Sequence, residues 1–181
     1  MKENIDIRLL TAKEAIESEM FEEAINILDE LIAENCSEAM VIRSGIDLAD
    51  ESAEDMNNRE INLLTKAALL GNAEALYYMS IHYDTGDIVN VDKDLAIFYS
   101  ELAAEKKHPH ALWRRGMRML YQKNNVEQGL KIIEEAAALK SEGAIRTLAS
   151  FYQNGEFGYP KDDHKASELM SIAESDGCLL I

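Results

Sequence analysis

Apolar and small residues recur along the chain in copies about three dozen residues apart. The copies align on four alanines with spacings of 36, 36 and 33 residues: Ala39, Ala75, Ala111 and Ala144. Offsets of one, four, five and eight residues from each alanine fall on one stripe of an α-helix, and most of them are apolar or small. At offset five the residue is always small, so that a neighbouring helix can approach closely: Ser44, Ser80, Gly116 and Ala149. Each copy therefore begins with a predicted helix, here termed helix A.

A second helical register follows in each copy and predicts a helix B. It starts at Ala24, Glu60, Ala96, Gly129 and Ala166, and Glu60 is the exception to the small residue expected there. One hairpin of helices A and B cannot cover its own apolar face, whereas stacked hairpins bury a continuous core. We expect helices at about residues 4–17, 20–34, 37–49, 55–70, 73–84, 93–106, 109–122, 125–139, 141–153 and 163–175.

The loops between helices A and B carry residues that end one helix and start the next. Gly86 and Gly155 stand where a helix ends, and glycine readily adopts the left-handed conformation of such a cap. Asp92 and Asp162 stand just before the next helix, where a carboxylate can accept hydrogen bonds from free backbone N–H groups. The equivalent loop before Gly129 is three residues shorter, which explains the spacing of 33.

These features resemble the Sel1-like repeat family, which is related to the tetratricopeptide repeat. The best matches run from Ala75 to Ala104 and from Ala144 to Gly177. The copy between them departs from the family pattern, with Arg115 where leucine is usual and Met119 where tyrosine is usual. Residues 1–60 match weakly, and their segment from Phe21 to Leu31 looks more like the second helix of a tetratricopeptide repeat.

The resemblance implies an all-α fold, a right-handed α-α superhelix (solenoid) of about four to five helical hairpins. It also implies a concave face that binds proteins, and no catalytic residues. We expect a single helical-repeat domain over residues 1–181, made of a TPR-like hairpin, four Sel1-like repeats and an apolar tail. The expected bounds are 1–36 for the hairpin, 37–72, 73–108, 109–141 and 142–177 for the repeats, and 178–181 for the tail.

The charge of the chain is uneven. The formal net charge is −16, and residues 1–60 hold 17 acidic and 5 basic residues, whereas residues 61–124 hold 7 and 8. We expect no nucleic-acid partner, because a surface this acidic repels phosphate backbones. It would steer a basic protein partner inward, although charge of this kind also serves solubility alone.

Catalytic and metal-binding motifs are not evident in the sequence. No nucleophile elbow, phosphate-binding loop or dinucleotide fingerprint is present. His108 and His110, with Glu105 upstream, come nearest to a metal cluster, but ligands on one helix face usually stand three or four residues apart. His82 is expected to be packed or on the surface. We therefore predict no enzyme, no cofactor and no metal.

The termini and cysteines bear on the cellular location. Cys36 and Cys178 belong to no paired motif, which fits a reducing compartment, and no apolar run suggests a signal peptide or a membrane span. These features predict a cytoplasmic protein. Residues 178–181 have the form of a prenylation box. The favoured interpretation is that this apolar tail covers the last open groove, because one lipid without a second signal anchors poorly.

Most candidate partner-binding residues lie on a second face of the A helices, at offsets two, three and six, and Arg115 and Arg118 stand beside Trp113. They are aromatic, basic or long apolar side chains, the types enriched at binding hot spots: Tyr77, Tyr78, Trp113, Arg114, Arg115, Met117, Arg118 and Arg146. The alternative is that these residues belong to the core or that the arginines pair with acids of neighbouring helices.

Two acidic stretches could form a further surface. The expected oligomeric state is a monomer or a weak homo-oligomer. The first is Glu14, Glu17, Glu19, Glu22 and Glu23, and the second is Asp47, Asp50, Glu51, Glu54 and Asp55. The leading functional interpretation is a module that binds a partner protein or peptide. The alternative is an immunity or antitoxin-type inhibitor of a basic toxin such as a nuclease, held by electrostatic complementarity.

Overall fold

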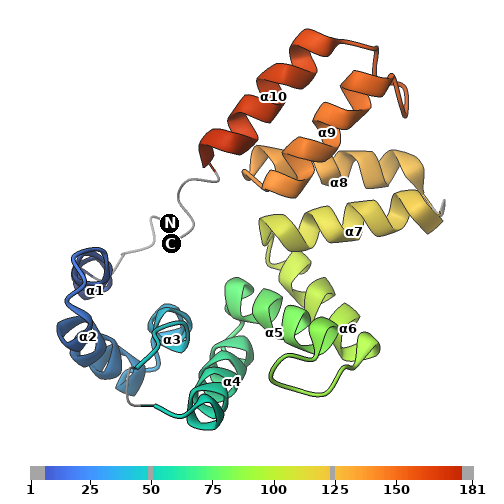
Figure 1. Ribbon diagram of the computed structural model, residues 1–181. Coiled ribbons are helices and arrows are strands. Elements are labelled where there is room, and N and C mark those ends of the chain that lie inside the picture. The colour runs from blue at the N-terminus through green and yellow to red at the C-terminus, as the bar shows by residue number, and fades with distance from the viewer. Residues whose placement is uncertain (1–6, 49–50, 123–124, 177–181) are drawn as a thin grey trace. The chain divides into compact units, whose positions relative to one another are not determined.

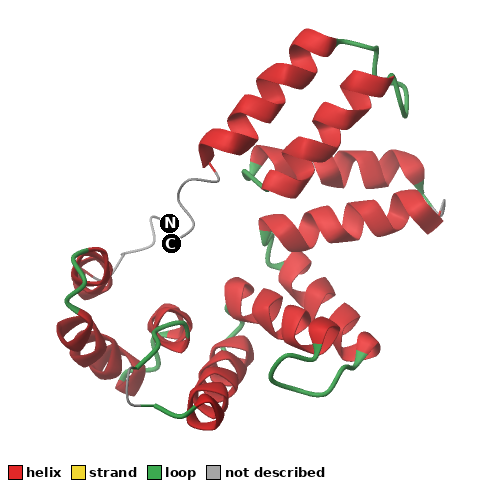
Figure 2. Cartoon of the chain, viewed as in Figure 1, coloured by secondary structure: helices red, strands yellow, loops and turns green. Residues whose placement is uncertain are grey.

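Helices account for all the regular structure in the part of the chain that the structure describes. The computed structural model describes residues 7–48, 51–122 and 125–176 (Figures 1 and 2). The elements are α1 (Ile7–Glu17), α2 (Phe21–Ala33), α3 (Ser37–Ser44), α4 (Ala53–Leu69), α5 (Ala73–Thr85), α6 (Lys93–Glu105), α7 (Pro109–Gln122), α8 (Val126–Ala138), α9 (Glu142–Asn154) and α10 (Asp163–Asp176). The predicted all-α class is confirmed, and most predicted helix bounds lie within two residues of the observed ones.

The chain divides into two compact units. Unit 1 is Met1–Tyr99 and unit 2 is Ser100–Ile181, so that the boundary falls within α6. In unit 1, α1 packs on α2, α2 on α3, α3 on α4, and α4 on α5. In unit 2, α7 packs on α8, α8 on α9, and α9 on α10. This sequential packing is what stacked hairpins require.

The alanines that mark the repeat are fully buried. Ala39, Ala75, Ala111 and Ala144 are all 0% exposed. Around Ala39 and Ala75, unit 1 forms a core of larger side chains that includes Leu28, Leu31, Met40, Leu64 and Met79. Small residues at the helix contacts therefore allow the larger neighbours to interlock, as close-packed interiors demand.

Glycine makes the contact between α7 and α8 possible. A Cβ atom at Gly116 would lie 2.6 Å from Cγ1 of Ile133 and 2.9 Å from the carbonyl oxygen of Gly129. A Cβ atom at Gly129 would lie 3.1 Å from the carbonyl oxygen of Gly116. The two backbones thus approach each other at a point where neither helix has room for a side chain.

The two longer loops end and start their helices in the same way, as predicted. Gly86 and Gly155 adopt left-handed conformations, with φ of 82° and 71°. The backbone N–H of Asp92 donates to the carbonyl of Tyr83 at 2.9 Å, and that of Asp162 donates to the corresponding tyrosine carbonyl at 2.8 Å. Each aspartate side chain then accepts a hydrogen bond from the first turn of the following helix.

Helix α3 is shorter than the predicted 37–49, because side-chain contacts hold the chain out of helix after Ser44. Arg59 donates from Nη1 to the carbonyls of Arg43 and Ser44, at 2.9 and 3.2 Å, and from Nη2 to the carbonyl of Ile46 at 2.9 Å. Its Nη2 also forms an ion pair with Glu51 at 2.7 Å. Free carbonyls at the end of α3 are therefore satisfied by an arginine from α4.

The unexpected Glu60 is explained by a contact with the next helix. Oε1 of Glu60 lies 3.0 Å from Nε2 of His82 in α5, and both side chains are mostly buried. The exception to the small-residue pattern is thus a polar pair between two neighbouring helices.

We predict that Gly116→Ala destabilises unit 2 by about 2 kcal/mol, because the new methyl group overlaps backbone that cannot move freely. Helix propensity alone would favour alanine by up to about 1 kcal/mol. Urea denaturation followed by circular dichroism, which reports on the helices of both units, measures the stability of each variant. Gly45→Ala is the control, because a Cβ there meets only the Ile42 carbonyl oxygen at 3.9 Å. Equal stabilities for the two variants would contradict the prediction.

The ion pair of Glu51 makes the stability of the protein depend on pH. The hydrogen bond from Arg59 holds the pKa of the Glu51 carboxyl below its ordinary value of 4.5. A lowered folded-state pKa adds stability above pH 4.5, and this contribution is lost as the pH falls through the lowered value. We expect wild type to lose more stability on acidification through this window than Glu51→Gln, as measured by thermal unfolding. Parallel pH profiles would show that the pair contributes nothing.

Candidate protein-interaction surface

The predicted binding residues fall into two groups, one in each unit. Tyr77 and Tyr78 lie on α5 in unit 1, with ring centroids 6.3 Å apart. Tyr78 is 41% exposed, whereas Tyr77 is half-buried. Partial burial raises the pKa of the Tyr78 phenol, and the nearby Glu74 carboxylate adds to this. The Tyr78 phenol therefore keeps its proton at physiological pH and can take part in hydrogen bonds.

Trp113 packs inside unit 2. Its Nε1 donates to Oγ1 of Thr147 in α9 at 3.0 Å. Its ring lies against Gly143, where a Cβ atom would come within 2.8 Å of two ring carbons. Thr147 also donates to the carbonyl of Gly143 at 2.7 Å. The indole therefore joins α7 to α9, in agreement with the packing alternative.

Three of the predicted arginines are engaged in ion pairs. Arg115, which stands where the repeat family has leucine, donates from Nε to Oε2 of Glu101 at 2.8 Å and from Nη2 to the carbonyl of the same residue at 2.9 Å. Arg118 pairs with the same carboxylate. Arg146 donates to Glu142, one turn earlier on α9, at 2.7 Å. Arg114 is half-buried on α7. The positive charges of Arg115, Arg118 and Arg146 are therefore largely neutralised by carboxylates of the protein itself.

An apolar cavity of about 570 Å³ opens between α7, α9 and the loop after α9. Most of its lining is aromatic or aliphatic: Met117, Leu120, Tyr121, Thr147, Ser150, Phe151, Glu156 and Phe157. Met117 is the one predicted residue in this lining. Tyr121 is 79% exposed and Phe157 is 47% exposed, so that two aromatic rings border the cavity where it meets solvent.

The loop that carries Phe157 is held by contacts to α8 and α9. Measured between centroids, the ring of Phe151 lies 4.8 Å from that of Phe157 and 5.7 Å from that of Tyr159. Oη of Tyr159 donates to Oε1 of Glu134 in α8 at 2.6 Å. Burial raises the pKa of the Tyr159 phenol well above its usual value of 10, and the hydrogen bond to Glu134 adds to this. The phenol therefore keeps its proton and its hydrogen bond at physiological pH.

The histidines singled out from the sequence have structural partners. Nδ1 of His108, which is buried, accepts a hydrogen bond from the backbone N–H of Ala111 at 3.3 Å and so caps α7. Nδ1 of His110 lies 3.2 Å from Oγ of Ser141. Within residues 7–48, 51–122 and 125–176, no group of three metal-ligating side chains comes together. In the same residues no helix is both long and apolar enough to span a membrane. The possible prenylation box at 178–181 lies outside the described residues.

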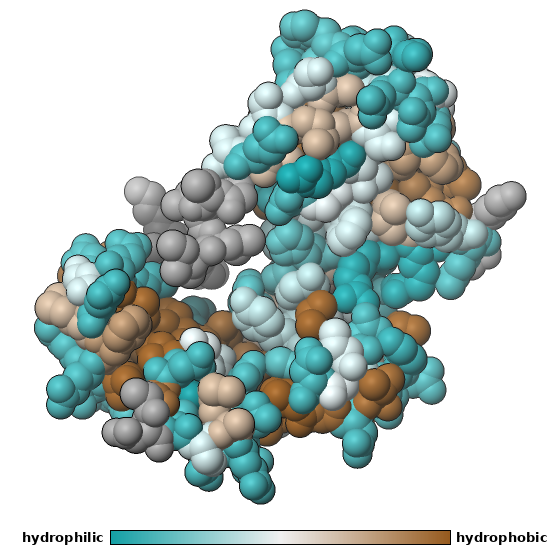
Figure 3. All heavy atoms as spheres, viewed as in Figure 1, coloured by the Kyte–Doolittle hydropathy of each residue, from teal (hydrophilic) through white to brown (hydrophobic). Residues whose placement is uncertain are grey.

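Exposed apolar side chains lie in patches among hydrophilic ones in both units (Figure 3). The second predicted acidic stretch does not remain a free acidic surface, because Glu51 is bound to Arg59 and Asp55 accepts a hydrogen bond from Ser52 at 2.7 Å. Asp50 lies outside the described residues. Three residues of the first stretch, Glu19, Glu22 and Glu23, line a separate hollow on α2.

Comparison with known proteins decides the family of these repeats. The Sel1 repeat model matches residues 73–108 and 144–178, which hold the pairs α5–α6 and α9–α10. The chain contains Sel1 repeats. Both matches fall where the sequence predicted the best agreement, and the unmatched pair between them has the shorter loop. The Sel1 repeat fold is a scaffold for protein–protein interaction, and proteins built from it are typically not enzymes.

Solved structures agree on the Sel1 fold. A Sel1 repeat protein from Oxalobacter formigenes superposes with a TM-score of 0.70 at 18% identity, over 93% of this chain and 70% of that one. The protective antigen c5321 of uropathogenic Escherichia coli, which displays an SLR fold, gives 0.59 at 21% identity, over 83% of this chain and 32% of that one. Pseudomonas aeruginosa 5086 superposes with a TM-score of 0.50 at 16% identity, over 86% of this chain and 74% of that one. No curated protein matches the sequence. At these identities the likeness establishes the fold alone.

We expect Trp113→Ala to destabilise unit 2 by about 3 kcal/mol, because it removes a large packed ring and the hydrogen bond to Thr147. Trp113→Phe keeps most of the ring and should cost about 1 kcal/mol. Urea denaturation followed by circular dichroism measures both. If Trp113→Ala is as stable as wild type, the indole is free to serve a partner instead of the fold.

Proposed function

We propose that this protein is an interaction module that holds an apolar or aromatic side chain of a partner protein in the cavity between α7 and α9. The observation that carries the proposal is the pair of exposed aromatic rings, Tyr121 and Phe157, at the border of an apolar cavity. Exposed apolar surface around a cavity is typical of protein-binding sites, and aromatic residues dominate their energetics. The cavity is lined by the A helices α7 and α9, and Met117 is the one residue of its lining among the partner-binding residues expected from the sequence.

The backbone at Phe157 supports a functional role for its side chain. Its φ is 52°, in the left-handed region that bulky residues rarely adopt, and the next residue is Gly158. A loop selected for stability alone would place glycine or asparagine at such a position. The local cost is offset if the ring has a task that a smaller residue cannot perform.

The size of the cavity indicates what it can accept. A volume of about 570 Å³ is within the usual range for sites that take a compact ligand or side chains of a partner. Ser150, Thr147 and Glu156 supply the few polar groups of the lining. We therefore expect the partner to offer one large apolar side chain with polar groups beside it.

The narrower alternative is an inhibitor of the immunity type, bound to a basic toxin. The observation that favours a basic partner is the excess of acidic residues in 1–60, 17 against 5 basic ones. Such a partner would associate rapidly and lose affinity as salt concentration rises. The apolar cavity is compatible with it, because an interface commonly combines an apolar centre with a charged rim.

Peptide selection tests the proposed cavity. Peptides selected from a displayed random library against the wild-type protein should share an aromatic or large aliphatic residue. Phe157→Asn should weaken their binding about tenfold, since it removes an exposed ring while asparagine tolerates the left-handed backbone. Fluorescence polarisation with labelled peptides gives the dissociation constants.

The matched control is Ile172→Ala, which removes an equally exposed apolar side chain (47%) on α10, away from the cavity lining. It should leave the affinity unchanged. Selected peptides that bind both variants and wild type equally well would place the binding site elsewhere.

A further inference from the structure

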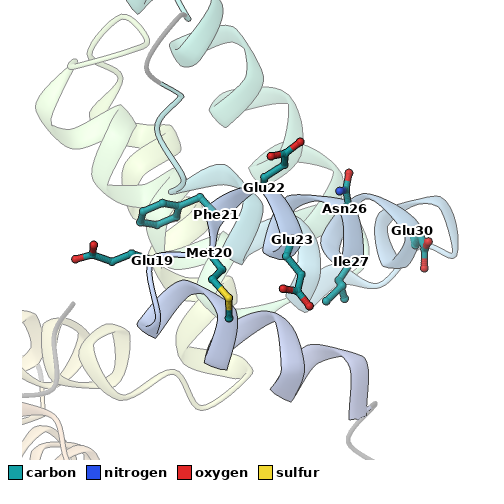
Figure 4. A pocket seen from close by; sticks show the side chains of 8 residues that line it. All are labelled: Glu19, Met20, Phe21, Glu22, Glu23, Asn26, Ile27 and Glu30. Carbon is teal, nitrogen blue, oxygen red and sulfur yellow. The ribbon is translucent and has the colours of Figure 1, made fainter.

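A second hollow lies in unit 1, along one side of α2 and the turn before it. Its volume is about 690 Å³, and it is lined by Glu19, Met20, Phe21, Glu22, Glu23, Asn26, Ile27 and Glu30. In Figure 4, Met20, Glu23 and Ile27 point to the same side of α2, with Glu19 and Phe21 near one end and Glu30 at the other. Residues three and four apart share a helix face, so Glu23, Ile27 and Glu30 follow one another along the helix. Glu22 and Asn26 point to the other side of α2 in the same view, and the lining residues together are termed the α2 strip.

The carboxylates of this strip have no polar partner in the part of the chain that the structure describes, unlike acids such as Glu51 and Glu101, which pair with arginines. Among the described residues, Glu19, Glu22, Glu23 and Glu30 form no ion pair or side-chain hydrogen bond. The arginines of the same unit are committed elsewhere. Arg8 pairs with Glu34, Arg59 with Glu51, and Nε of Arg43 lies 3.5 Å from Asp29. The strip therefore keeps its negative charge uncompensated by the described part of unit 1.

Helix stability does not account for this arrangement. Glu22 and Glu23 lie in the first turn of α2, where the helix dipole favours acids, but Glu30 lies in the last turn, where it disfavours them. Like charges three or four residues apart also repel each other along the helix. A partner that supplies positive charge would convert this repulsion into attraction.

The residues at the start of α2 also depart from what the fold alone would select. Glu19 has a φ of 60°, and Met20 occupies the N-cap position without a side-chain hydrogen bond to the helix. Serine, threonine, aspartate or asparagine would cap it better. Phe21 is 46% exposed and Met20 is 48% exposed. Two large apolar side chains thus reach solvent beside uncompensated carboxylates.

We propose that the α2 strip docks a basic amphipathic segment of a partner protein. Lysine or arginine side chains of the segment lie against Glu19, Glu22, Glu23 and Glu30, and its apolar side chains cover Met20, Phe21 and Ile27. This surface is separate from the cavity between α7 and α9 and lies in the other unit. It adds a charge requirement to a module whose other site selects for apolar shape.

The combination of charge and apolar surface selects this class of partner. Anionic membranes and nucleic acids are repelled by the carboxylates. A small cation would gain nothing from the exposed Met20 and Phe21. A basic protein segment satisfies both features at once, since the long stems of lysine and arginine also cover apolar surface.

The probe is a synthetic amphipathic peptide with lysines at helical spacing beside a face of leucine and phenylalanine. Its affinity for the full chain is measured by fluorescence polarisation at low and high salt. Glu23→Gln/Glu30→Gln should weaken binding about tenfold, because two favourable charge contacts are lost. Glu14→Gln/Glu17→Gln is the matched control, since it changes the net charge equally on exposed positions of α1 outside the hollow. It should change the affinity less than twofold.

Two further variants separate this proposal from others. Met20→Ser/Phe21→Ser should also weaken binding of the peptide, whereas Phe157→Asn, at the cavity between α7 and α9, should leave its affinity unchanged. Equal loss in the two charge variants would reduce the effect to long-range attraction and overturn the proposal. So would equal binding of the same peptide with glutamates in place of its lysines. A negative result for the α2 strip does not contradict the proposed function of the cavity between α7 and α9, because that site is tested with other peptides and another variant.

Discussion

The close approach of paired helices at small residues is the constraint on which this structure depends. Alanines at the repeat positions are fully buried, and at Gly116 and Gly129 two helices meet where neither has room for a Cβ atom. Such contacts let larger side chains interlock around them, which supplies most of the favourable burial. The cavity in unit 2 is lined by such helices, α7 and α9, and the strip in unit 1 by α2 and the turn before it.

The regular part of the fold could be predicted from the sequence because its causes are local. Small residues at helical spacing, glycine at a left-handed position and aspartate before a helix act within a few residues of the chain. The departures have partners on other helices. The early end of α3 needs Arg59 from α4, and Glu60 is understood only with His82. Arg115 replaces a leucine because Glu101 of α6 lies beside it.

The binding features were harder to predict for the same reason. Spacing alone placed Trp113 on a candidate face, but it could not show that Gly143 leaves room for the ring against α9. Phe157 belongs to no helical stripe, and it reaches the cavity only because Tyr159 fastens the loop to Glu134. The aromatic residues gathered between Phe151 and Tyr159 were the available signal. A loop so rich in aromatic side chains has more apolar surface than a connection needs.

The charges of the protein fall into two sets with different physical roles. Acids such as Glu51 and Glu101 are used up within the fold, each facing an arginine of a neighbouring helix. The carboxylates of the α2 strip face solvent and form no ion pair or side-chain hydrogen bond with the described part of the chain. Because these two sets share few residues, the strip can change in sequence without unfolding the hairpins. A repeat scaffold that separates packing from recognition in this way can acquire a new partner by altering its surface while its core stays the same.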